Sequence, residues 1–228
     1  MRIEPFTVGS YVHTLKRGAR GLPITGDESD KYRFLRILYC MNDEFLDENW
    51  NRDSVSAGGL FHRPESRSPR RPLANIVAYT LMPNHIHLLL QEIRAGGITA
   101  FMQKIGQSMT NHFNEKYDQK GSIFQGPYKS RTISNDKYMR YVSAYIMVKN
   151  VFELYPLGGL NGATANFEMA WKWAIAYPFS SLADYCGERH TPIIEKSTFE
   201  EIFGSPDEFK SFARDVIMGG KWLTQDFE

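Results

Sequence analysis

Two histidines separated by one residue, His85 and His87, are the side chains of this sequence whose spacing most directly suggests joint chemistry. They lie in the run M-P-N-H-I-H-L-L-L-Q, whose apolar and β-favouring residues predict a strand. Side chains two positions apart on a strand project from the same face, so both imidazoles should point one way. Two neutral imidazoles on one face can bind a divalent cation. The pair can equally well serve only packing and hydrogen bonding within the fold.

Three tyrosines, Tyr138, Tyr141 and Tyr145, recur further along the chain with helical spacing. Positions i, i+3 and i+7 lie on one side of a helix, so the three side chains form a stripe. A phenol has an ordinary pKa of about 10, and a nearby cation would be needed to ionise it or orient it for attack near neutral pH. Core packing explains such a stripe as well as chemistry does. The stripe alone therefore assigns no function.

The elements that position these residues follow from the hydrophobic pattern. A tight turn at Pro83 and Asn84 should join two adjacent strands. Gly126 and Pro127 restrict the last strand to a sheet edge or a bulge. The order βαββαβα predicts an α+β fold of the ferredoxin-like type, an antiparallel sheet carrying helices. The expected strands are residues 10–16, 73–82, 85–92 and 123–133, and the expected helices are residues 30–41, 98–117 and a third from Asn135.

The length of the chain suits one domain of ordinary size with additions. Residues 1–150 would form the main domain, with an irregular insertion at about residues 42–71, and residues 151–228 would form a C-terminal extension packed on it. The runs F-E-E-I-F and F-K-S-F-A-R-D-V-I in the extension predict short amphipathic helices. Three roles stay open for them: cover for the core, a dimer contact, or recognition of a binding partner.

Composition excludes several classes of protein. A net charge of +1 on 228 residues means that any nucleic-acid surface must be local rather than a property of the whole chain. Cys40 and Cys186 are far apart and form no C-x-x-C motif, which argues against a disulfide framework or a cysteine zinc site. No apolar run has the length of a membrane span or resembles a signal peptide. We expect a folded cytoplasmic protein that does not enter a membrane.

Several longer motifs follow one another in a characteristic order. They are H-T-L-K-R-G, M-P-N-H-I-H-L-L-L, F-Q-G-P-Y-K-S, Y-M-R-Y-V-S-A-Y-I and Y-P-F-S-S-L-A-D-Y, and together they span about residues 10–185. In this order and spacing the sequence resembles the REP-associated tyrosine transposases, which belong to the single-tyrosine HUH transposase superfamily. The order of the motifs is much more specific than any one of them.

This resemblance implies a mechanism and assigns residues to it. His85 and His87 would bind Mg²⁺ or Mn²⁺, and Tyr145, which is followed by isoleucine as in the family, would attack DNA. The enzyme would cleave and rejoin single-stranded DNA near hairpins through a 5′-phosphotyrosine intermediate. The family commonly has an asparagine ligand four residues after the tyrosine, but Lys149 stands there in this sequence. A one-residue slip in the helix could bring Asn150 to the metal as the third ligand, or Lys149 could instead contact a phosphate; we favour Asn150.

The partner implied is single-stranded DNA carrying a hairpin, either a REP-like palindrome or an element end, bound by a monomer or a homodimer. Two other functions stay open: a domesticated hairpin-binding protein without catalysis, and a metal-dependent hydrolase that uses the histidines to activate water. The candidate DNA contacts are a possible base-stacking residue, Tyr128, and the cations Arg17, Arg20, Lys129, Arg131 and Lys149.

Overall fold

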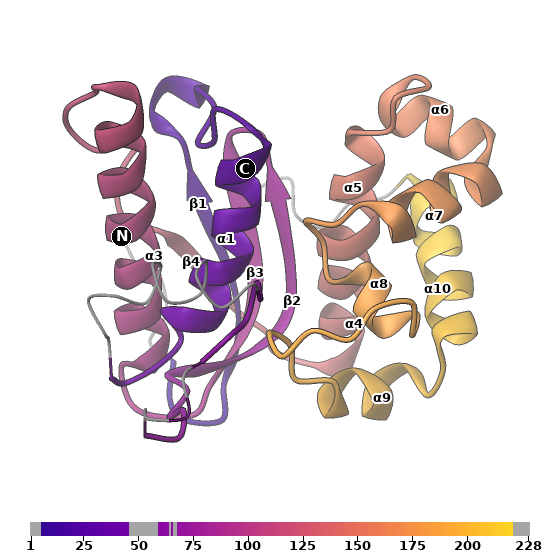
Figure 1. Ribbon diagram of the computed structural model, residues 1–228. Helices are drawn as coiled ribbons and strands as arrows, with labels where there is room; N and C mark the ends of the chain where they lie inside the picture. Colours follow the sequence, from indigo (N-terminus) through magenta and orange to yellow (C-terminus); the bar gives the residue numbers. More distant parts are fainter. Residues whose placement is uncertain (1–5, 46–58, 64, 66–67, 221–228) are drawn as a thin grey trace.

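A four-stranded antiparallel sheet forms the centre of the protein (Figure 1). The computed structural model describes residues 6–45, 59–63, 65 and 68–220. The strands lie in the order β2-β3-β1-β4, with the two longest connections carrying helices. This is the expected ferredoxin-like arrangement, and the predicted fold class is confirmed. The strands are β1 (Tyr11–Arg17), β2 (Ala74–Met82), β3 (His85–Glu92) and β4 (Lys129–Thr132).

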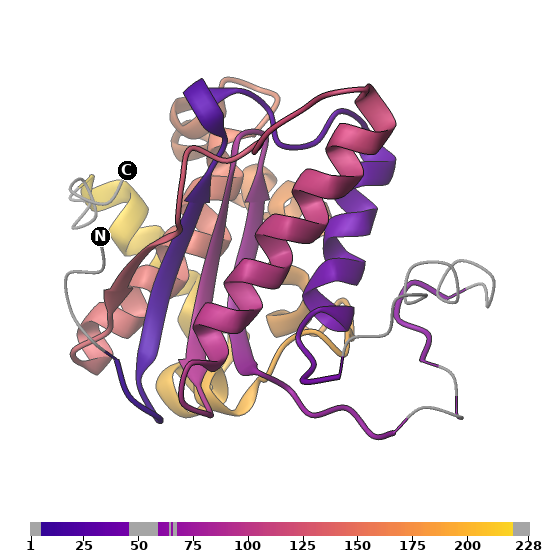
Figure 2. The ribbon, with the colours of Figure 1, turned by 90° about the vertical axis from the view of Figure 1, so that its left-hand side faces the viewer.

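Two helices, α1 (Glu28–Cys40) and α3 (Gly97–Tyr117), cover one face of the sheet (Figure 2). The strand β3 contributes Ile86, Leu88 and Leu90 to the core beneath them, as its alternation predicted. The residues of β3 that alternate with these therefore face the other side of the sheet.

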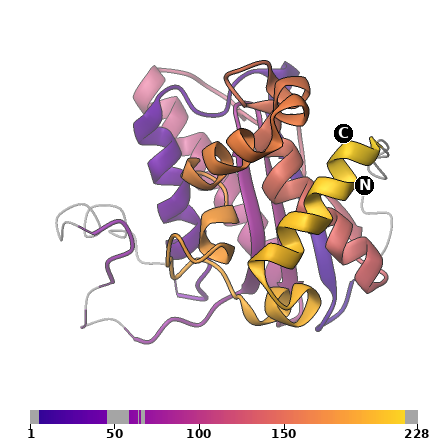
Figure 3. The ribbon, with the colours of Figure 1, turned by 90° about the vertical axis from the view of Figure 1, so that its right-hand side faces the viewer.

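The second face of the sheet is covered by the helices that follow β4 (Figure 3). A continuous helical run consists of α4 (Asp136–Ala144), the π-helix η2 (Tyr145–Lys149) and α5 (Asn150–Glu153). Asn135 caps its start by accepting a hydrogen bond from the backbone N–H of Tyr138. The further helices are α6 (Gly159–Ala165), α7 (Phe167–Ala176), α8 (Leu182–Tyr185), α9 (Ser197–Phe203) and α10 (Pro206–Gly219).

The short helices predicted in the extension are present as α9 and α10. They pack against α4 and share one apolar core with it and with the sheet. The side chain of Arg140 on α4 donates to the carbonyl of Ile202 and lies 4.8 Å from the ring centre of Phe203. The helical run passes through residue 150 without interruption. The expected boundary between the main domain and the extension at this residue therefore stays a prediction.

One strand differs from its sequence expectation. Strand β4 is shorter than residues 123–133, because Gly126 and Pro127 interrupt the pairing and leave Phe124 with an isolated bridge to Gly18. The predicted insertion at residues 42–71 lies largely outside the described residues, and its described parts form no helix or strand. None of the described helices is long and apolar enough to cross a membrane.

A buried carboxylate, Asp30, joins the start of α1 to the end of α3. It accepts hydrogen bonds from the Gly26 N–H at 2.7 Å and from the His112, Lys116 and Tyr117 side chains at 2.8 to 2.9 Å. Burial opposes ionisation of this carboxyl, but these hydrogen bonds outweigh it and hold the pKa of Asp30 well below its ordinary range. The ionised form therefore stabilises the packing of α1 against α3.

Replacing this carboxylate should give a pH-dependent loss of stability. We expect Asp30→Asn to lower the free energy of unfolding by about 2 kcal/mol at pH 7, since charged hydrogen bonds are lost. Because the folded pKa lies below the unfolded value of about 4, this difference should narrow as the pH falls below about 4. Urea unfolding at several pH values measures it, with the exposed Asp215→Asn as control. A difference that is independent of pH would contradict this assignment.

Candidate active site

His85 and His87 both face the helical run that contains Tyr145. Their rings contact each other edge to face, with centroids 4.8 Å apart, and the side chains are only 8% and 0% exposed. The Nδ1 of His85 lies 2.6 Å from the side-chain oxygen of Asn84, so Nδ1 carries the proton and Nε2 keeps a lone pair. The turn residue before β3 therefore fixes the tautomer of the first histidine.

A third histidine, His13 on β1, completes a cluster that sequence reasoning missed. Its Nε2 lies 2.9 Å from Nδ1 of His87, and both rings are fully buried. The Nε2 atom of His87 has no hydrogen-bond partner within the described part of the chain. If Nδ1 of His87 donates to His13, this Nε2 carries an available lone pair. His13 begins the motif H-T-L-K-R-G of the first expected strand, but the sequence did not indicate its contact with His87.

The electrostatics of the cluster favour a neutral imidazole at His87. Burial, together with the neighbouring His13 and His85, holds the pKa of His87 well below its ordinary value. Lys149 and Arg17 act in the same direction. A neutral imidazole at this position is the form that can coordinate a cation or accept a hydrogen bond.

Tyr145 lies directly against these histidines. Its ring centre is 5.5 Å from that of His87 and 6.0 Å from that of His13, both in edge-on geometry. The ammonium of Lys149 lies 4.8 Å from the centre of the tyrosine ring and forms an ion pair with Glu153 at 2.7 Å. The tyrosine side chain is 1% exposed. The structure thus brings together Tyr145, the histidine pair and Lys149, but in an enclosed arrangement.

The helix carrying Tyr145 changes its register at this residue. The backbone N–H of Asn150 donates to the carbonyl of Tyr145, five residues earlier, which is the π-helical pattern. One turn along such a helix contains an extra residue, so Asn150 takes the place that residue 149 would have in an α-helix. This is the one-residue slip that the sequence led us to expect. The role of Asn150 as a ligand stays a prediction.

The side-chain amide of Asn150 is buried without a hydrogen-bond partner among the described residues. It is 0% exposed, and neither its amide nitrogen nor its amide oxygen has a hydrogen-bond partner among the residues that the structure describes. Buried amides are almost always hydrogen-bonded, so an amide without partners at this position needs an explanation. A ligand or cation that binds the amide oxygen would supply one.

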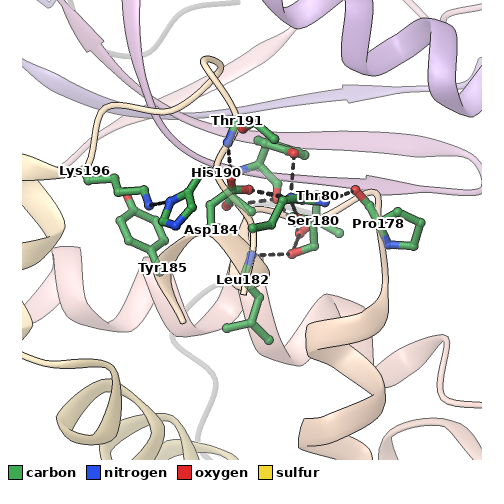
Figure 4. Close-up of polar contacts among 12 residues, drawn as sticks. Thr80, Pro178, Ser180, Leu182, Asp184, Tyr185, His190, Thr191 and Lys196 are labelled. Carbon is green, nitrogen blue, oxygen red and sulfur yellow. Dashed lines mark hydrogen bonds and ion pairs between the residues drawn. The ribbon is translucent and has the colours of Figure 1, made fainter. Parts of the chain in front are cut away.

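A threonine on the neighbouring strand stabilises the π-helix. The hydroxyl of Thr80 lies 2.6 Å from the carbonyl oxygen of Ile146. It also lies 3.3 Å from the hydroxyl of Ser180 (Figure 4). A π-helix leaves the usual α-helical hydrogen bonds unmade, and a buried carbonyl there needs another donor. In the register of the sheet, Thr80 lies opposite His87. The same strand position thus supports both the histidine and the tyrosine helix.

The segment Y-P-F-S-S-L-A-D-Y holds this threonine in place from the extension. Residues 80 and 180 form an isolated bridge, and Ser181 accepts a hydrogen bond from the backbone N–H of Tyr79 at 3.0 Å. The buried carboxylate of Asp184 binds the backbone N–H of Thr191 at 2.8 Å (Figure 4) and the guanidinium of Arg189. The motif therefore stabilises β2 and contributes no side chain to the histidine and tyrosine cluster.

Three of the predicted DNA-binding cations lie on the face of the sheet that bears the histidines. Arg17 lies opposite His85 in the register of β1 with β3, and Arg131 lies opposite His13 in the register of β1 with β4. Lys129 is two residues before Arg131 and projects from the same face, at the exposed edge of the sheet. These cations can contact a phosphate backbone that approaches the tyrosine from this edge.

Two other predicted contacts lie elsewhere. Tyr128 projects from the opposite face of the sheet, where its hydroxyl lies 3.1 Å from that of Thr99 on α3. Alternation along β4 explains this position, since Tyr128 and Lys129 are adjacent and must point in opposite directions. Arg20 lies in an exposed turn, the 3-10 helix η1 (Ala19–Gly21), with a φ of 56°. Neither residue is part of the histidine and tyrosine cluster.

The donor atoms present fit a hard or borderline divalent cation. Two imidazole nitrogens, from His85 and His87, and one amide oxygen, from Asn150, are ligand types that Mn²⁺ accepts and Mg²⁺ tolerates beside oxygen ligands. No group of three or more His, Cys, Asp and Glu side chains in the described residues is arranged to hold a metal ion. A cation here therefore requires Asn150, and oxygens from substrate or water, to complete its coordination.

Comparison with known proteins locates the similarity in this part of the chain. Residues 70–149 match the family model of IS200-like transposases, a segment of about a third of the chain that runs from β2 to the end of the π-helix. No curated protein matches the sequence. A solved structure described as a REP-associated tyrosine transposase bound to a REP hairpin aligns with 86% of this chain and 89% of its own, at 16% identity and a TM-score of 0.45. That similarity is too low to support an argument about function.

Removing the Thr80 hydroxyl should loosen the π-helix. We expect Thr80→Val to cost about 1–3 kcal/mol of stability, because the hydrogen bond from Thr80 to the buried carbonyl of Ile146 is lost. Amide hydrogen exchange should quicken at residues 145–150, as measured by mass spectrometry. The matched control is Thr14→Val, a buried strand threonine whose hydroxyl makes a longer contact of 3.4 Å on the other face. Equal exchange in both variants would contradict the proposed support.

Proposed function

We propose that this protein is a DNA strand-transfer enzyme in which Tyr145 attacks a phosphodiester of single-stranded DNA next to a hairpin. One observation carries the proposal: the ring of Tyr145 meets His87, with centroids 5.5 Å apart, although the two come from separate elements. Both residues lie in the segment that matches IS200-like transposases. The geometry and the family similarity therefore point to the same side chains.

The reaction would be a transesterification. The oxygen of Tyr145 forms a bond to phosphorus while the bond from phosphorus to the 3′-oxygen breaks. The phenol loses its proton and the departing 3′-oxygen gains one, which leaves a 5′-phosphotyrosine and a free 3′-hydroxyl. Attack by another 3′-hydroxyl reverses these steps and releases the tyrosine. The enzyme thus cleaves and rejoins DNA without an external energy source.

A divalent cation held by His85, His87 and Asn150 would polarise the phosphate and favour ionisation of the attacking phenol when bound. The protein's own charges act in the same direction. The ammonium of Lys149 lies 4.8 Å from the ring centre of Tyr145 and can stabilise negative charge on the phenol or the phosphate. Its ion pair with Glu153 fixes the position of this side chain.

The DNA would approach along the edge of the sheet. Lys129 and Arg131 are exposed on the edge strand β4, and Arg17 lies beside the histidines. These charges form a local basic surface on a chain whose net charge is only +1. A binding affinity that falls with increasing salt concentration is expected from such phosphate contacts.

The enclosed position of Tyr145 sets a condition for catalysis. At 1% exposure the side chain is out of reach of a DNA phosphate, so the helix or the side chain must shift before attack. The same observation favours the second candidate function, a hairpin-binding protein that has lost catalysis. The two candidates differ in whether a covalent protein–DNA adduct forms.

An adduct assay separates these functions. With Mn²⁺ and labelled hairpin DNA from around its own gene, the wild-type protein should form a denaturation-resistant adduct. Tyr145→Phe should reduce adduct formation at least about 1000-fold, since the nucleophilic oxygen is missing. Tyr138→Phe and Tyr141→Phe serve as controls and should retain it. Hairpin binding without an adduct in the wild type would support the binding protein.

A second test addresses the cation ligands directly. We expect Asn150→Ala to weaken Mn²⁺ binding about 10-fold to 100-fold, as measured by calorimetry without DNA, because a ligand oxygen is removed. Lys149→Ala removes a neighbouring positive charge and should leave Mn²⁺ affinity unchanged or increase it. Weaker binding in Lys149→Ala with normal binding in Asn150→Ala would contradict the assignment of Asn150.

A further inference from the structure

A cavity of about 530 Å³ lies on the face of the sheet opposite Tyr145. It opens between α3 and the segment 122–128 that leads into β4. In Figure 2, α3 crosses the sheet on this side and leaves β1 and β4 beside it. The cavity is separate from the histidine cluster, because neighbouring residues of β1 point to opposite faces.

The wall formed by α3 is polar and uncharged. Thr99, Gln103, Gln107 and Asn111 follow one another at intervals of four residues and line the cavity as one row. The amides of the last three are exposed and make no hydrogen bond within the described part of the protein. Such amides can donate and accept hydrogen bonds at once, as the edges of nucleobases require.

The opposite wall is aromatic. Phe124 and Tyr128 line it together with Pro127. The hydroxyl of Tyr128 contacts Thr99 at 3.1 Å and so positions the tyrosine ring at one end of the cavity. Aromatic side chains opposite a row of amides offer stacking on one side and edge recognition on the other.

The floor of the cavity contains a buried cation. Lys16 is 9% exposed, its ammonium donates to the carbonyl of Gly126 at 3.3 Å and it lies 4.6 Å from the ring centre of Phe124. No carboxylate pairs with it among the described residues, and burial lowers its pKa. The glycine at position 106 makes room for this side chain, since a Cβ there would lie 2.7 Å from its Cε. A buried ammonium with spare donors needs an acceptor from a ligand.

We propose that this cavity binds one unpaired nucleotide of the DNA, with its base between the aromatic wall and the amide row and an acceptor atom of the base facing Lys16. This inference rests on the proposed function, because it concerns the single strand that adjoins the hairpin. A base offers carbonyl and ring-nitrogen acceptors to the ammonium and a flat face to the aromatic rings. None of the described residues that line the cavity is acidic, which suits an approaching phosphodiester.

The position of the cavity connects it with the active site. The edge strand β4 separates the two sites, with Lys129 and Arg131 facing the tyrosine side and Tyr128 facing the cavity side. A single strand that crosses this edge can place one nucleotide in the cavity and a neighbouring phosphodiester on the tyrosine side. The cavity would then fix which phosphodiester is presented.

The test measures the affinity of fluorescein-labelled hairpin DNA with single-stranded flanks, by anisotropy in the absence of divalent cations. A series of oligonucleotides carries one abasic site at each flanking position. For the wild type, one position should weaken binding about tenfold or more, since one stacked base is lost. Gln107→Glu and Lys16→Met should weaken binding of the intact DNA similarly and should show no further loss at that abasic position.

Matched variants control for charge and folding. Gln119→Glu places the same charge on an exposed residue outside the cavity, and Lys172→Met removes the same charge from the exposed surface of α7. Both should retain the wild-type response to the abasic series, and circular dichroism confirms folding of each variant. If no position stands out, if the wild type binds no hairpin DNA, or if the cavity variants respond to the abasic site as the wild type does, the proposal is wrong.

The effect of the abasic site on binding is independent of catalysis. Tyr145→Phe should keep the abasic response, because it leaves the cavity unchanged. Absence of a covalent adduct in the wild type, together with a position-specific abasic effect, would refute the proposed strand transfer and support the cavity. An adduct without any abasic effect would support the proposed strand transfer and refute the proposed nucleotide site.

Discussion

The hydrogen bond from Thr80 to the carbonyl of Ile146 is the interaction on which the geometry of the site depends. A π-helix is less favourable than an α-helix unless its freed backbone groups find partners, and the buried strand supplies one here. With the extra residue accommodated, Tyr145 meets His87 and the buried amide of Asn150 comes one turn further along. The extension contributes by holding the threonine through Ser180, so its motif is structural support for the site.

Alternation along the strands places the two proposed sites on opposite faces of the sheet. On β1, His13 and Arg17 face the tyrosine helix, whereas Lys16 faces α3 and the cavity. The edge strand β4 repeats this division, with Lys129 and Tyr128 on opposite sides. A narrow sheet with an accessible edge can thus present the proposed reaction centre on one face and the proposed nucleotide site on the other.

The sequence was sufficient for the fold and for much of the site. Periodicity indicated every strand and the three helices of the ferredoxin-like core, and the spacing of His85 and His87 indicated their shared face. It gave no indication of His13 as a partner, because that contact joins β1 to β3 and depends on strand order. The face of the sheet on which Tyr128 lies could not be predicted, since the exact start of β4 decides which residues share a face. The burial of Tyr145 also depends on long-range packing that local patterns do not encode.

The central claim is that the oxygen of Tyr145 becomes bonded to DNA, and mapping the attached nucleotide by mass spectrometry tests it most directly. Trypsin cleavage after Arg140 and Lys149 releases a peptide that contains both Tyr141 and Tyr145. After reaction with hairpin DNA and nuclease digestion, fragmentation of this peptide should place a 5′-linked nucleotide on Tyr145. A nucleotide on Tyr141, on Tyr138 or on no tyrosine would contradict the account.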